Sequence, residues 1–153
     1  MRISARVDYA VRAAVELAAA GEDGGLVTAE AVSRAQDIPH RFLDHILASL
    51  RHAGLVESRR GPEGGHRLAR PPEEITVAEI IRAIDGPLAS VGGTRPDQLD
   101  PPGAAAPMRD VWVAVRASLR QVLEEVSIAD VAQGSLPDVV RELAADADAW
   151  SPH

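Results

Sequence analysis

Hydrophobic positions in the first third of the chain repeat at helical spacing in three successive segments. Residues 4–20 carry apolar side chains at intervals of three or four, and a glycine-rich turn follows. A short second helix is expected behind Thr28, a good N-cap residue, and a third over 39–53, which Gly54 ends as a left-handed residue. Two helices joined by so short a turn predict a helix-turn-helix.

A β-hairpin is expected directly after these helices. Two segments with strand character, 55–60 and 66–70, flank the glycine-rich stretch 61–65. A hairpin that follows a helix-turn-helix at once is the wing of a winged-helix domain. We place this wing at 56–70.

The next helix has the clearest start in the sequence. Thr76 and Glu79 form a capping box, and Ile75 and Ile80 can pack on each other as a hydrophobic staple. The helix ends before a stretch rich in glycine and proline, 86–107, which shows no periodicity. A long loop is therefore expected there.

A long amphipathic helix is expected over about 108–126. Its apolar positions alternate at spacings of three and four, the pattern of a seam between paired helices. We predict a dimerisation helix whose contacts are made by Trp112, Val115, Leu119, Val122 and Val126. Ser127 then caps a short helical turn, and a last acidic helix begins at Pro137 and runs to about residue 149.

Together these elements predict a mainly α fold in three parts. Residues 1–85 form a winged helix-turn-helix domain with a two-stranded wing, and residues 86–107 form the loop. Residues 108–153 form the long C-terminal dimerisation helix and the helices after it. A chain of 153 residues is long enough for one cored domain with appendages, so one compact unit is expected.

The composition excludes several classes of function. No cysteine is present, so disulfides, thiolate metal sites and cysteine nucleophiles are excluded. No stretch approaches the roughly 18 consecutive apolar residues of a membrane span, and the start lacks a signal-peptide core, so we expect a cytoplasmic protein without a membrane partner. One Phe, one Tyr and two Trp leave little for stacking on single-stranded bases, which favours duplex DNA.

The net charge of −7 is unevenly distributed along the chain. Residues 1–70 carry ten Arg and nine acids, whereas residues 71–153 carry six Arg and fourteen acids. Within 34–70 there are seven Arg, four acids and four of the five histidines. This basic window coincides with the third helix and the wing, so the electrostatics favour DNA binding there.

The predicted DNA contacts come from the third helix and the wing. Arginines around a flexible hairpin tip can lie against phosphates or enter a narrow minor groove, and side chains near the start of the third helix can face base edges. Arg41 could bind guanine, and Asp44 could accept a hydrogen bond from a cytosine amino group. The predicted contact residues are Thr28, His40, Arg41, Asp44, His45, Arg51, Arg59, Arg60, Gly64, Gly65, His66 and Arg67.

Each of these features also has a structural explanation that competes with the functional one. A helix-turn-helix pattern occurs in many helical domains, and the hairpin could be an ordinary solvated one. Because phosphate repels a carboxylate, Asp44 is either a selective base reader or a sign that its face points elsewhere; we adopt the first interpretation.

Metal binding and catalysis find little support in the sequence. The spacings between His40, His45 and His52 are five and seven, which does not place two ligands on one helix face as an i, i+4 pair would. No nucleophile elbow or phosphate-binding glycine loop is present. We therefore predict no metal, no cofactor and no enzyme activity.

The stretch from Ala53 to Leu68, AGLVESRRGPEGGHRL, closely resembles the wing of the IscR, NsrR and CymR regulators. Asp8-Tyr9-Ala10 and the segment from Ile75 to Gly86 also fit, and the resemblance covers roughly residues 1–133. It implies dimeric winged-helix regulators that bind palindromic operators through the third helix and the wing, and it makes 86–107 the effector region. By position it implies a base-reading role for Asp44 and a minor-groove role for Arg60.

The chain departs from this family in the region that holds an iron-sulfur cluster. Cluster-binding members place three cysteines, and often a histidine, between the fourth helix and the long helix, whereas residues 94–110 contain neither. The third cysteine position falls near Ala106 and the histidine position on Arg109. Asp8 remains in the first helix, but one carboxylate cannot hold a cluster, and we interpret it as a structural polar residue.

The sequence thus predicts a homodimeric bacterial transcriptional repressor that binds double-stranded DNA and has no iron-sulfur cluster. Its partners would be duplex DNA, a second copy of the chain, and a small-molecule or protein effector. The alternative is a winged-helix adaptor that binds proteins instead of DNA, which the acidic second half makes conceivable.

Overall fold

The computed structural model describes residues 2–21 and 24–152. Helix α1 (Ala5–Ala20) begins after Ser4, whose hydroxyl accepts from the backbone N–H of Val7 and donates to Asp85 at 2.7 Å. Helix α2 (Ala29–Gln36) begins after Thr28, whose side chain accepts from the N–H of Ala31. The cap predicted at Thr28 is confirmed.

Helix α3 (His40–His52) completes the helix-turn-helix. The turn before it depends on Asp37, which adopts a left-handed conformation with φ of 50°, and on Ile38, which is buried. Gly54 follows α3 with φ of 74°, in the left-handed region that favours glycine. The expected end of the third helix is therefore confirmed.

The core forms where α1 meets α3, α4 (Val77–Asp85) and α6 (Ile128–Gln133). The buried face of α1 is mostly alanine, which lets the helices approach closely, while α3 contributes larger side chains. The buried residues of α1 and α3 are Val7, Ala10, Ala13, Ala14, Leu17, Leu43, Ile46, Leu47 and Leu50. Packing of its buried side against this core orients α3 so that its opposite side is exposed to solvent.

The wing is an antiparallel hairpin of β1 (Val56–Arg59) and β2 (Gly65–Leu68), with Val56 opposite Leu68 and Arg59 opposite Gly65. Val27, just before α2, exchanges two backbone hydrogen bonds of 2.8 and 2.9 Å with His66. This bridge fastens the wing to the helix-turn-helix.

Two glycines predicted as DNA contacts have a clear structural role in the wing. A Cβ at Gly65 would lie 2.8 Å from the Val27 carbonyl oxygen, and one at Gly64 would lie 2.2 Å from the Arg59 carbonyl oxygen. Both approaches are too close for any larger residue. Gly64 and Gly65 therefore shape the wing and its attachment, whatever else they contact.

Helix α4 begins with the predicted capping box, because Thr76 and Glu79 each bind the other's backbone N–H. Ile75 and Ile80 are fully buried in the core, as the predicted staple requires. A short 3-10 helix η1 (Pro72–Glu74) joins the wing to this cap. Ser127 caps α6 with a second capping box that includes Asp130.

The segment 86–107 contains more local structure than its composition predicts. It includes the 3-10 helices η2 (Pro96–Gln98) and η3 (Gly103–Ala105) and a turn in which Val91 and Thr94 exchange backbone hydrogen bonds. Pro96 is buried. Contacts with the long helix, which periodicity cannot predict, order this loop.

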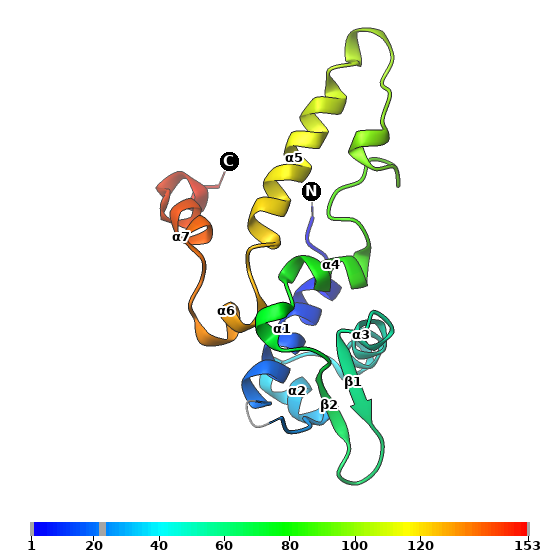
Figure 1. Cartoon of the computed structure of the whole chain (residues 1–153), viewed down its shortest axis with the longest axis vertical. Helices are drawn as coiled ribbons and strands as arrows, with labels where there is room; N and C mark the ends of the chain where they lie inside the picture. Colours follow the sequence, from blue (N-terminus) through cyan, green and yellow to red (C-terminus); the bar gives the residue numbers. More distant parts are fainter. Residues whose placement is uncertain (1, 22–23, 153) are drawn as a thin grey trace.

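Helix α5 (Met108–Leu123) extends away from the winged-helix domain (Figure 1) and has no fully buried residue. The prediction that this helix continues to Val126 is wrong. The chain has already turned back to the core there: the Val126 side chain is buried, and its carbonyl accepts from the N–H of Val77. Val126 is therefore not part of the α5 seam.

The C-terminal region is broken into two short elements, α7 (Asp138–Ala145) and the 3-10 helix η4 (Ala147–Trp150). One continuous helix to about residue 149 was expected. Asp146 is extended and its carboxylate accepts from the N–H of Asp148, which starts a new turn and ends α7. Among the described residues, no helix combines the length and the apolar character needed to cross a bilayer.

Candidate nucleic-acid interface

Helix α3 presents a polar face away from the core. At 100° per residue, its four buried positions share one side, and Arg41, His45, Ala48 and His52 project from the opposite side. All four are exposed. An exposed polar face on the second helix of a helix-turn-helix, next to a wing, is the arrangement that places a helix in the major groove.

The flank of α3 nearest α2 and the wing carries His40, Asp44 and Arg51. The His40 ring lies between two carboxylates, with Nε2 at 3.7 Å from Glu30 and Nδ1 at 3.7 Å from Asp44. Glu30 belongs to the first turn of α2. The structure thus places His40 beside Glu30, a residue that is not among the predicted contacts.

The other flank of α3 borders a shallow hollow with α1 and α4. Phe42, His45, Ser49 and His52 line it, together with Arg6 and Ala83. The Arg41 guanidinium lies 4.9 Å from the centre of the Phe42 ring, which itself packs near Tyr9. This stacking orients Arg41 along the helix surface while leaving its charge exposed.

The wing arginines fall into two groups. The side chains of Arg59 and Arg60 are exposed and make no hydrogen bond or ion pair with any described residue. Arg67, in contrast, is paired across the hairpin with Glu57 at 3.0 Å, because the register places the two residues opposite each other. Arg70 binds Glu79 at 2.6 Å and the carbonyl of Glu74, so it braces the start of α4.

His66 lies in the wing strand next to α2 and pairs with the opposite strand. Its Nδ1 lies 2.7 Å from the Ser58 hydroxyl on the opposite strand. Burial lowers the pKa of His66, and the nearby positive charge of Arg51 lowers it further, while Asp44 and Glu30 act in the opposite direction. The neutral imidazole of His66 is therefore favoured.

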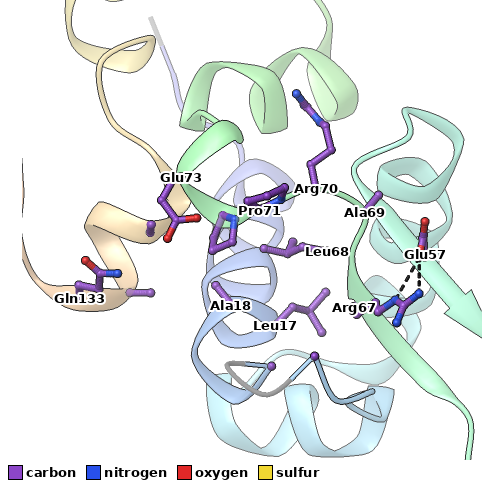
Figure 2. Close-up of a pocket in the computed structure, with 15 residues that line it drawn as sticks. Leu17, Ala18, Glu57, Arg67, Leu68, Ala69, Arg70, Pro71, Glu73 and Gln133 are labelled. Atoms are coloured by element: carbon purple, nitrogen blue, oxygen red, sulfur yellow. Dashed lines mark hydrogen bonds and ion pairs between the residues drawn. The ribbon is translucent and has the colours of Figure 1, made fainter.

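A cavity of about 590 Å³ lies behind the wing root, on the side of α1 and α6 (Figure 2). Leu17, Ala18 and Leu68 line its apolar part, and the Arg67–Glu57 pair lies at one edge. Glu73 and Gln133 come from η1 and α6 at another edge. Its residues belong to segments far apart in the sequence, so no local pattern predicts this cavity.

The region where the resemblance places the cluster ligands offers no set of side chains that fits an iron-sulfur cluster. Asp97 lies in this region, but it forms a bidentate pair with Arg95 at 2.7 and 3.1 Å and also lies 3.6 Å from Arg116 on α5. The hydrogen bonds from Arg95 lower the pKa of Asp97. No three His, Cys, Asp or Glu side chains in the described ranges lie close enough to hold a metal ion.

A second, mostly apolar groove of about 800 Å³ runs between α5, the start of α1 and α4. From the predicted seam it includes Val115, Leu119 and Val122, while Trp112 lies in an adjoining hollow with Leu88 and Pro96. Leu143 of α7 reaches the same groove and is more than half exposed. Four of the five predicted dimerisation residues thus lie along one apolar surface.

Comparison with known proteins agrees with this architecture. The chain is 51% identical over 146 residues to an HTH-type transcriptional regulator of Mycobacterium tuberculosis, covering 95% of this chain and 90% of that protein. It is 33% identical over 147 residues to the regulator IscR of Cereibacter sphaeroides, covering 89% and 90%. The structure of CymR, the global cysteine regulator of B. subtilis, superposes with a TM-score of 0.73 at 30% identity, covering 88% of this chain and 98% of that one.

The family comparison covers the winged helix and the long helix together. Residues 3–134 match the model of the Rrf2 family, which is described as an iron-dependent transcriptional regulator. The fold, the helix-turn-helix and the wing all agree with this match, and the chain contains no cysteine. The chain belongs to the Rrf2 family of DNA-binding transcriptional regulators and is a cysteine-free member of the IscR and CymR type.

Proposed function

We propose that this chain is a homodimeric transcriptional repressor that binds a palindromic operator through α3 and the wing, without an iron-sulfur cluster. The observation that carries the proposal is the pair of free arginines, Arg59 and Arg60, on a wing fastened beside the polar face of α3. Unpaired guanidiniums in this position can bind phosphates and enter a narrow minor groove.

Base recognition falls to the N-terminal half of α3. Arg41 carries an exposed guanidinium that can bind guanine, and Asp44 carries a carboxylate that can accept from the cytosine amino group. By its position in the family's wing, Arg60 would enter the minor groove. Arg67 contributes less than the sequence predicts, because Glu57 offsets its charge.

The dimer forms along α5. A 16-residue amphipathic helix without one fully buried side chain needs a partner surface, and a second α5 with the same seam supplies it. Val115, Leu119 and Val122 would be covered in this arrangement. The α3 helices of the two subunits would then lie about 34 Å apart, which is one turn of DNA, as a palindromic site requires.

Repression would follow by steric exclusion of the transcription machinery from the promoter, in the cytoplasm of a bacterium. An effector, whether a small molecule or a protein, would act through the 86–107 segment. Because Asp97 is held by two arginines there, this segment would respond to something other than an iron-sulfur cluster.

The proposal is tested by a gel shift of the full-length protein with the DNA upstream of its own gene. The result expected is a specific complex that weakens steeply as salt rises. The alternative function, a protein-binding adaptor, is favoured by the excess of fourteen acids over six arginines in residues 71–153. An adaptor would give no complex at any salt concentration, and that result would overturn the proposal.

A further inference from the structure

The His40 ring lies between two carboxylates at the start of α3. Its two nitrogens face two different carboxylates, Glu30 of α2 and Asp44 of α3, each at 3.7 Å. All three side chains are about half exposed or more, with exposed fractions of 48%, 68% and 66%. The imidazole therefore links the two helices of the helix-turn-helix on their solvent side.

If Asp44 recognises a base, its carboxylate must be oriented toward the groove. A carboxylate at a DNA surface is repelled by phosphates, and an exposed Asp can rotate away from the groove. Among the described residues, His40 is the side chain that faces the Asp44 carboxylate at ion-pair distance. Its Nδ1 lies near Oδ2, which leaves Oδ1 available to accept from a base.

The surrounding charges favour the same orientation. Arg51 lies on the same flank of α3. The charges of Asp44, Glu30 and Arg51 all act on the imidazole of His66 in the wing. Glu30 lies 3.7 Å from Nε2, the ring nitrogen of His40 that does not face Asp44. The Asp44 carboxylate thus lies on the flank of α3 that carries His40 and Arg51, next to α2 and the wing.

We propose that His40 is a positioning residue for base recognition: held by Glu30, it orients the Asp44 carboxylate so that the protein selects cytosine at one position of each half-site. This inference rests on the proposed function. A carboxylate accepts from the cytosine amino group, whereas guanine and thymine present acceptor oxygens and adenine places its N7 acceptor beside its amino group, so we expect about a tenfold preference for cytosine at that position.

The test is selection from a random duplex library by the full-length protein, followed by sequencing. The wild type should enrich an inverted repeat with one strongly preferred cytosine per half-site. Asp44→Ala should abolish this preference. His40→Leu should reduce it to less than about threefold while leaving the other positions unchanged, and His40→Gln, whose amide can still donate to Asp44, should keep most of it.

Thermal melting verifies that the variants keep their fold. If His40→Leu is unstable, His40→Ala, which suits an exposed helix position, gives the same comparison. The inference is overturned if the His40 variants keep the wild-type preference, or if they weaken all positions equally. Enrichment of no sequence by the wild type would instead overturn the proposed function together with the inference.

Discussion

The free and the paired arginines of the wing should contribute very differently to DNA binding. Arg60 is exposed and without a partner among the described residues, so its whole charge is available to a phosphate. Arg67 is already neutralised by Glu57 at 3.0 Å. The informative perturbations are therefore Arg60→Ala, which removes a free charge, and the double variant Glu57→Gln/Arg67→Gln, which removes a neutral pair.

The size of the difference follows from counterion release. Each phosphate neutralised contributes about 0.9 to the slope of log affinity against log salt, so Arg60→Ala in both subunits should lower the slope by about 1.8. At about 0.1 M salt this corresponds to roughly 60-fold in affinity, or about 2.5 kcal/mol. The double variant leaves the net charge unchanged, and its slope should stay within about 0.5 of the wild type.

The assay is fluorescence anisotropy of a labelled operator duplex, titrated with full-length protein at several salt concentrations. A second control is Glu57→Gln alone, which frees Arg67 and should steepen the slope. Equal slopes for the wild type and Arg60→Ala would show that the wing does not lie on the phosphates. A loss in the double variant as large as that in Arg60→Ala would refute the distinction between free and paired arginines.

Three further results are expected. Leu119→Glu should convert the dimer to a monomer in sedimentation experiments without changing the melting of the winged-helix domain, because Leu119 lies in the α5 groove; a dimer that persists would contradict the seam. The pKa of His66 is below its ordinary 6.5 in the folded chain, so the unfolded chain binds more protons at acidic pH. The free energy of unfolding should therefore be largest above about pH 6.5 and should fall at lower pH, and His66→Gln should weaken this pH dependence in urea titrations. Thr76→Ala should cost about 1 kcal/mol in the same titrations, because it removes the α4 cap; no loss would argue against the capping box.

The elements that the sequence predicts well are those whose ends depend on local chemistry. The caps at Thr28 and Thr76 and the left-handed Gly54 mark helix ends through side-chain or backbone preferences that need no tertiary contact. The glycine-rich tip likewise marks the hairpin. These features are short-range, so one sequence is enough to place them.

The features that sequence analysis missed depend on contacts between distant segments. Val126 continues the heptad spacing, yet its backbone binds Val77 and its side chain enters the core, which ends α5 early. The pairing of Arg67 with Glu57 depends on strand register, and the approach of Glu30 to His40 depends on how α2 meets α3. Periodicity classifies these residues correctly as polar or apolar, but it cannot predict which residues they contact.

The central claim is that the wing arginines lie against duplex DNA. It is tested most directly by placing a photoreactive side chain at position 60, with position 141 on α7 as the control, and irradiating the full-length protein with promoter DNA and a competitor protein mixture. The account predicts that position 60 cross-links to DNA and position 141 does not. Cross-links from position 60 to polypeptide alone would contradict it.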